Sequence, residues 1–221
     1  MLNKIIAITW KDIIAEMRTK EVLTSVFIFT ILVIVLFTFA FGGEAQTMAA
    51  VAPGVLWATF AFAGVLALNR TFVPEKEQGC LEGLMLCPVP REVIYLGKML
   101  GSLIFLLLVE AITLPIFAAL FNVPVLTLPV ILVTLLTTVG FVAVGTLFSA
   151  LSINTRAREM VLPILFFPVV APIIIAAVMA SGMALGGQPW GDYLSWIEII
   201  LAFDVIFLVV SFLIFSFVIE E

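Results

Sequence analysis

The chain contains no histidine and few charged residues, and each of these absences excludes some classes of protein function. Only 11% of the 221 residues are charged, whereas 64% are hydrophobic. Soluble domains are about a quarter charged and about half apolar, so this composition excludes a soluble enzyme, a nucleic-acid binder and a disordered tail. Without histidine there is neither an HExxH zinc motif nor a histidine base, and GxSxG is also missing. The sequence therefore predicts no catalytic residue and no metal site.

Cysteine is scarce as well. Cys80 and Cys87 are the two cysteines, and their spacing matches no CxxC redox or zinc motif. Both lie in a segment that we place in the cytoplasm below, where thiols stay reduced. We interpret them as small apolar residues.

Long apolar runs make up most of the sequence, and the length of each is close to the roughly 20 residues with which a helix crosses a bilayer. They predict an all-α membrane protein formed by a single transmembrane domain. Six spans are expected near residues 22–41, 48–68, 94–121, 128–152, 160–181 and 197–219. Three prolines in the fifth span, Pro163, Pro168 and Pro172, predict a kinked or broken helix. Residues 182–195, which follow it, form either an outer loop or a re-entrant hairpin.

The basic residues set the orientation. All ten lysines and arginines precede the first span or lie between spans two and three or four and five, with Lys98 at the start of the third span. The other three connections contain none. The positive-inside rule therefore places these basic segments, and both termini, in the cytoplasm.

Residues 2–20 have the pattern of an amphipathic helix. Lys4, Lys11 and Arg18 are spaced by seven and share one face. The opposite face is apolar and contains Ile6, Trp10, Ile13, Ile14 and Met17. A helix of this kind lies flat in the inner headgroup layer, so we expect an interfacial helix; a cytosolic extension of the first span is the alternative.

The cytoplasmic segment 70–93 carries the most detailed pattern. Pro74 can begin a helix, and Pro88 and Pro90 must end it, which leaves about three turns. Apolar and acidic side chains separate onto two faces, as expected for a helix that docks a cytosolic protein. Ordinary loop structure is the alternative. The predicted contact residues are Glu75, Glu77, Gln78, Gly79, Leu81, Glu82, Leu84 and Arg91. A second, short cytoplasmic loop contains Arg156, Arg158 and Glu159, which contact either the same partner or lipid phosphates.

Two acids, Glu110 and Asp204, fall inside the third and sixth spans. An ionised carboxylate at the centre of a spanning helix costs about 3 kcal/mol, so each must face protein or water. We expect them to be protonated, or hydrogen-bonded to hydroxyls such as Thr113 or Ser211. Glu110 either lines a polar contact with another subunit or supports packing within the chain.

Pairs of glycines offer sites of close helix packing. Gly97 and Gly101 are four residues apart, and Gly140 and Gly145 are five apart. Because six spans are few for a transport pathway, self-association is expected, and these glycines are candidates for its contacts.

Several short motifs resemble the CcmB family, the membrane B subunit of the ABC transporter of cytochrome c maturation. They are Ala52-Pro-Gly-Val-Leu-Trp57, Leu66-Ala-Leu-Asn-Arg70 with Phe72, Gly79-Cys-Leu-Glu82, Leu84-Met-Leu86, Pro88-Val-Pro90 and Lys98. The resemblance implies an ABC-2-type permease in the bacterial inner membrane. Two copies would pair with two copies of a cytosolic ATPase, beside a small membrane subunit and a haem-handling one. ATP use would be linked to release of a haem-loaded chaperone.

The residues constrain this expectation. No GxxxxGK[ST] motif occurs, since Glu92 occupies the first glycine position before Gly97-Lys98-Met99, so ATP must be hydrolysed by a partner. Without histidine the commonest axial haem ligand is also missing, and we expect no directly bound cofactor. A generic ABC-2 exporter of a lipid, glycan or drug, and a non-transporting assembly scaffold, are the alternatives.

Overall fold

The computed structural model describes residues 1–42, 44–77, 79, 83, 89–152 and 158–218, and every regular element among them is a helix. The helices are α1 (Leu2–Thr19), α2 (Glu21–Ala40), α3 (Ala45–Leu68), α4 (Val73–Glu77), α6 (Arg91–Phe121), α7 (Leu128–Ser152), α8 (Arg158–Leu185) and α9 (Trp190–Val218). Within the described residues, six helices are long and apolar enough to cross a membrane: α2, α3, α6, α7, α8 and α9. The predicted six-span, all-α fold is confirmed.

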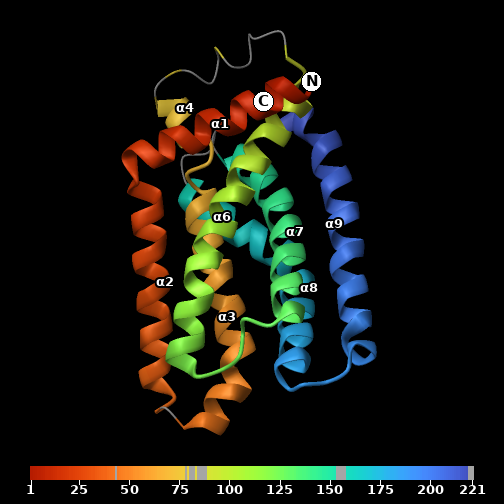
Figure 1. The fold of residues 1–221 in the computed structure, drawn as a ribbon. Coiled ribbons are helices and arrows are strands. Elements are labelled where there is room, and N and C mark those ends of the chain that lie inside the picture. Colours follow the sequence, from red (N-terminus) through yellow and green to blue (C-terminus); the bar gives the residue numbers. More distant parts are fainter. Residues whose placement is uncertain (43, 78, 80–82, 84–88, 153–157, 219–221) are drawn as a thin grey trace.

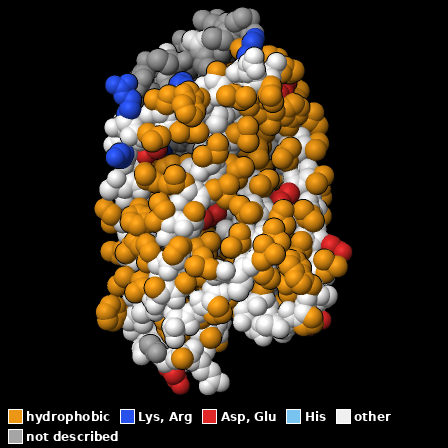
Figure 2. All heavy atoms as spheres, in the orientation of Figure 1, with side chains coloured by type: hydrophobic (Ala, Val, Ile, Leu, Met, Phe, Trp, Pro, Cys, Tyr) orange, Lys and Arg blue, Asp and Glu red, His pale blue; other side chains and the backbone are white. Residues whose placement is uncertain are grey.

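The six long helices run side by side, and α1 lies across one end of them (Figure 1). Both termini and α4 lie at this same end, as six crossings require. Lys and Arg side chains gather there, whereas hydrophobic side chains spread over the middle of the visible face, with a few acidic groups among them (Figure 2). This is the end that the basic residues assign to the cytoplasm.

The last two spans are longer than the apolar runs indicated. α8 is one helix from Arg158 to Leu185 despite its three internal prolines, so the predicted break is wrong. Only Gly186–Pro189 separates it from α9, and Gly187 has φ 71°, a conformation that glycine adopts without strain. Segment 182–195 is therefore not a re-entrant hairpin; it consists of two helix ends joined by a short outer loop, residues 186–189.

α7 is the central helix of the bundle. Of its most apolar stretch, 72% is buried, against 17% for the peripheral helix α2. It packs against α8, α9, α6 and α3. Its buried residues include the small or hydroxylated side chains Thr134, Thr137, Thr138, Gly140, Gly145, Thr146 and Ser149. In a bilayer, small residues of this kind let neighbouring helices approach closely, which explains why α7 is surrounded.

The paired glycines pack within the chain. A methyl group added at Gly140 would collide with Asp204 of α9, and one added at Gly145 would collide with Leu68 of α3. At Gly97 an added methyl group would collide with Ile8 of α1, whereas at Gly101 it would make an ordinary contact with Asp12 of α1. These four positions therefore explain the packing of one chain, and self-association needs other contacts.

α1 exposes its predicted apolar face and turns sharply into α2. Ile6, Trp10 and Met17 are more than half exposed, as expected for side chains that meet lipid. At the turn Lys20 adopts φ 54°, and the Glu16 carboxylate accepts a hydrogen bond of 2.8 Å from the backbone N–H of Leu23. Glu16 thus caps the first turn of α2 and fixes the angle between the two helices.

Candidate functional site

The predicted docking segment begins with a shorter helix than its prolines suggested. α4 ends at Glu77, and Gly79 has φ 66°, so one continuous three-turn helix through this glycine is wrong. Gly79 is exposed. The predicted contact residues Gln78, Leu81, Glu82 and Leu84, and the side chain of Glu77, lie outside the described residues.

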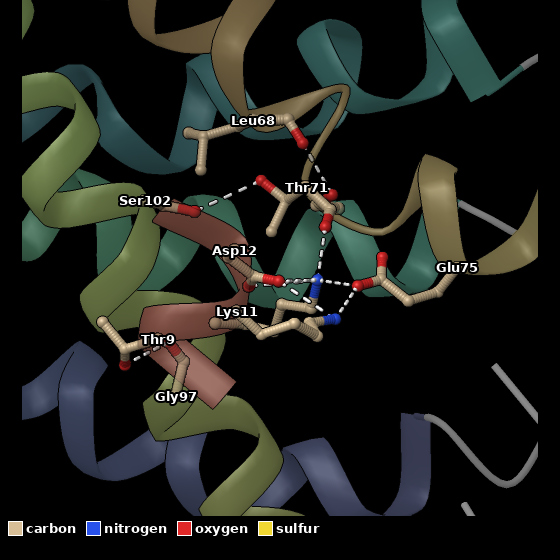
Figure 3. A network of polar contacts seen from close by, with 10 residues as sticks. Thr9, Lys11, Asp12, Leu68, Thr71, Glu75, Gly97 and Ser102 are labelled. Atoms are coloured by element: carbon tan, nitrogen blue, oxygen red, sulfur yellow. Dashed lines mark hydrogen bonds and ion pairs between the residues drawn. The ribbon is translucent and has the colours of Figure 1, made fainter. Parts of the chain in front are cut away.

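Glu75 points into the protein rather than away from it. It is only 8% exposed, and its Oε1 accepts hydrogen bonds from two lysines, Lys98 at 2.5 Å and Lys11. Figure 3 shows the Glu75 carboxylate from α4 and the Asp12 carboxylate from α1 on either side of the lysine nitrogens that contact both. A contact of Glu75 with a cytosolic partner stays a prediction, and the geometry gives this carboxylate a task inside the chain.

Lys98 is the centre of the cluster. It lies two turns inside α6 and is 1% exposed. Its ammonium donates to the Thr71 carbonyl at 2.9 Å and to Asp12 at 3.2 Å, in addition to Glu75. The Phe72 ring centroid lies 5.2 Å away, within the range of a cation–π contact. A buried ammonium needs such partners because desolvation alone would be prohibitive.

Lys11, Asp12, Glu75 and Lys98 form a neutral group of two cations and two anions, which we call the ion quartet. Burial alone would lower the pKa of Lys11, but the hydrogen bond to Glu75 and the charge of Asp12 raise it above its ordinary value. Burial alone would raise the pKa of Glu75, but Lys98 and Lys11 lower it. Both groups therefore stay ionised near neutral pH, and the quartet holds together α1, α4 and α6.

Close packing reinforces this junction. A methyl group on Gly97 would lie 2.7 Å from Cβ of Ile8, so the glycine is what lets α1 lie on α6. Thr9 donates a hydrogen bond of 3.0 Å to the Gly97 carbonyl. One turn further on, the corresponding atom on Gly101 would be 3.5 Å from Asp12. α1 is thus a docked part of the bundle as well as an amphipathic surface helix.

The remaining predicted contact residues occupy different places. Arg91 begins α6, and its guanidinium donates a hydrogen bond of 3.3 Å to the Ser216 carbonyl in the last turn of α9. This satisfies a carbonyl at a helix C-terminus, where a cation is favourable. Arg158 and Glu159 open α8, but their side chains, like Arg156 as a whole, lie outside the described residues.

The two intramembrane acids face protein, as expected, but the named hydroxyl partners differ. Glu110 lies 2.7 Å from the hydroxyl of Thr138 on α7. Thr113 has no hydrogen-bond partner among the described residues, and Ser211 meets Tyr95 of α6. Asp204 packs against Gly140 of α7. For Glu110 the cause is simple: its hydroxyl partner lies on the neighbouring helix α7, not one turn away on α6.

Sequence reasoning missed Asp12 and assigned Lys11 to the headgroup layer. One signal was available, since Lys98 is a lysine inside an apolar run and requires an acidic partner. Nothing in the sequence says which acid that is. No group of three or more metal-ligating acids, cysteines or histidines occurs in the described part of the chain.

The family model described as "CcmB protein" matches residues 3–220, nearly the whole length. The chain belongs to the CcmB family. It is 29% identical to Heme exporter protein B of Pseudomonas aeruginosa over 84% of this chain and 83% of that one. Heme exporter protein B of Rhodobacter capsulatus is 32% identical over 66% of this chain and 68% of its own. Heme exporter protein B of Escherichia coli is 38% identical over a third of each chain. As a CcmB member with six spanning helices, the chain is a multi-pass membrane protein of the ABC-2 permease type.

Proposed function

We propose that this chain is the permease subunit of a haem-exporter ABC transporter in cytochrome c maturation, located in the bacterial inner membrane. Family membership and the names of the relatives support the transporter assignment. The chain has no Walker A motif, so a cytosolic ATPase must supply the ATP hydrolysis. Release of a haem-loaded chaperone would follow from that hydrolysis.

In this proposal the ion quartet transmits movement from the cytoplasmic segment to the spanning helices. A cytosolic ATPase would push on the segment around Glu77 to Leu84, with Arg156, Arg158 and Glu159 as a second contact. Because Glu75 is bonded to Lys98 and Lys11, movement of this segment pulls on α6 and α1 together. Two copies of the chain would respond to two ATPases, and the motion would pass to the haem-handling and small membrane subunits. The chain itself would hold neither ATP nor haem.

The first experiment is haem staining of covalent c-type cytochromes in a strain that lacks this gene, with and without complementation. Loss and rescue of every c-type band is expected. Normal bands would contradict the proposed function and favour a generic exporter, whose ATPase would respond to a lipid, glycan or drug. Normal cytochromes with an ATPase-dead partner would instead favour an assembly scaffold.

The coupling contact has its own test. We expect charge reversal by Glu82→Lys to reduce co-purification of the ATPase while the spans stay folded. Glu21→Lys is a matched control, because Glu21 is an exposed acid at the same end of the bundle but on α2. Equal amounts of ATPase with both variants would contradict a contact at Glu82.

A further inference from the structure

The Glu110 side chain lies at the junction of four spanning helices and uses one of its two oxygens. Glu110 is 6% exposed, and its Oε1 is 2.7 Å from the Thr138 hydroxyl oxygen. Its Oε2 is buried and has no hydrogen-bond partner among the described residues. An open acceptor at this depth requires an explanation, because a buried polar atom without a hydrogen bond destabilises the folded protein.

The Thr138 hydroxyl makes two short contacts with oxygen atoms. Its oxygen lies 2.8 Å from the carbonyl of Thr134 as well as 2.7 Å from Glu110. A hydroxyl has one hydrogen, and a carbonyl can only accept. The single hydrogen of Thr138 is either shared between the two acceptor oxygens or donated to the carbonyl alone, and in the second arrangement Glu110 donates to Thr138. A carboxylate has no hydrogen to donate, so the second arrangement needs a neutral carboxylic acid, the form that burial among apolar side chains favours.

A small enclosed cavity adjoins this pair. Its volume is about 10 Å³, close to the space that one water molecule needs. Four helices line it, through Trp57, Phe60, Ala61, Leu106, Glu110, Thr138, Phe141 and Ile174. Glu110 is the only titratable side chain in this lining, so no charged side chain there favours its ionised form. Three of the lining side chains have polar atoms: Glu110, Thr138 and Trp57, whose indole N–H already donates to Ser181.

We propose that Glu110 is a neutral acid that donates to Thr138 and, with it, binds one water molecule at the junction of α3, α6, α7 and α8. The water donates one hydrogen to Oε2 of Glu110 and the other to the second lone pair of the Thr138 oxygen. This arrangement satisfies the open acceptor and ties α6 to α7 through two bridges. The site does not depend on which complex the chain joins.

Infrared spectroscopy of the purified full-length protein in lipid nanodiscs tests both parts. At pH 7.5 we expect a carbonyl band of a protonated carboxylic acid that Glu110→Gln removes and Asp204→Asn leaves in place. A Glu110→Gln spectrum that instead loses a carboxylate band would overturn the neutral acid. Exchange into H₂¹⁸O should shift a water stretching band that the wild type has and Glu110→Leu lacks. Absence of any such band would overturn the water site.

Two further measurements keep the test decisive if a Glu110 variant does not fold. ¹³C-labelling of glutamate in the wild-type protein should shift the acid band, which assigns it to glutamate rather than to aspartate. Thr138→Val removes the acceptor, so the same band should move to higher frequency. A band that neither treatment shifts would contradict the proposed hydrogen bond.

Discussion

Replacing Lys98 by methionine is the most direct perturbation of the ion quartet, because it keeps the length of the side chain and removes only the charge. The side chains of Lys98 and Glu75 are 2% and 9% exposed. Breaking a buried pair by removing one partner costs about 3–5 kcal/mol when the other charge is left without compensation. Because Lys11 still donates to Glu75, the lower end of this range, about 3 kcal/mol, applies here. We therefore expect Lys98→Met to lower the free energy of unfolding by about this amount.

Lys11→Met is the matched control, because it makes the same chemical change in the same cluster. The Lys11 side chain is 49% exposed. Solvent screens an exposed pair, which contributes about 0.2–1 kcal/mol. For a chain of this size, 1 kcal/mol corresponds to about 2–4 °C in Tm. Lys98→Met should thus lower Tm by about 6–12 °C, and Lys11→Met by about 4 °C or less.

The assay is thermal unfolding of detergent-purified protein, in which size-exclusion chromatography measures the fraction that stays folded after heating. The double variant Lys98→Met with Glu75→Gln restores neutrality with Lys11 and Asp12, and we expect it to regain about 0.5–3 kcal/mol relative to Lys98→Met alone. If Lys98→Met unfolds at the same temperature as Lys11→Met, the quartet does not hold these helices together, and the mechanical proposal loses its support.

Three further outcomes are expected from the same assay. Burial raises the pKa of Glu75, but Lys98 and Lys11 outweigh burial and lower it. The wild type should therefore be more stable than Glu75→Gln by a constant amount above the ordinary carboxyl pKa of 4.5, and this difference should vanish as the pH falls through the lowered pKa. A stability difference that grows in acid would refute the direction of the shift. Gly97→Ala should lower the free energy of unfolding by about 1–3 kcal/mol, because α1 must shift to accommodate the methyl group. Gly54→Ala is the control and should not destabilise the protein, because its added methyl group meets no atom within 4 Å. Glu16→Ala should cost about 0.5–2 kcal/mol by removing the cap of α2, and an unchanged Tm would show that the cap contributes nothing.

Hydropathy predicted the bundle well because the bilayer imposes it. The span expected at 128–152 coincides with α7, and the amphipathic pattern at 2–20 corresponds to α1. Where polar residues follow an apolar run, hydropathy marks the edge of the hydrocarbon layer and not the end of the helix. For this reason α8 and α9 extend beyond their predicted limits, to Leu185 and back to Trp190.

The ion quartet could not be predicted from local pattern. Asp12 and Lys98 are 86 residues apart, and periodicity relates a residue only to neighbours on its own helix. The spacing of Lys11 is equally consistent with a headgroup contact and with the buried carboxylate that it meets. Likewise, glycines four apart allow close packing but do not say whether the approaching helix, here α1 on Gly97, belongs to the same chain.

The position of Lys98 also determines the order in which the protein can assemble during synthesis. Asp12 and Glu75 are both made before Lys98, so their principal counter-charge is missing while the first two spans enter the membrane. During that period α1 has no bundle to dock on, and the membrane surface is the environment that accommodates both its apolar face and its charges. We therefore expect α1 to lie on the membrane surface during synthesis and to dock on the bundle only after the third span, α6, has been inserted.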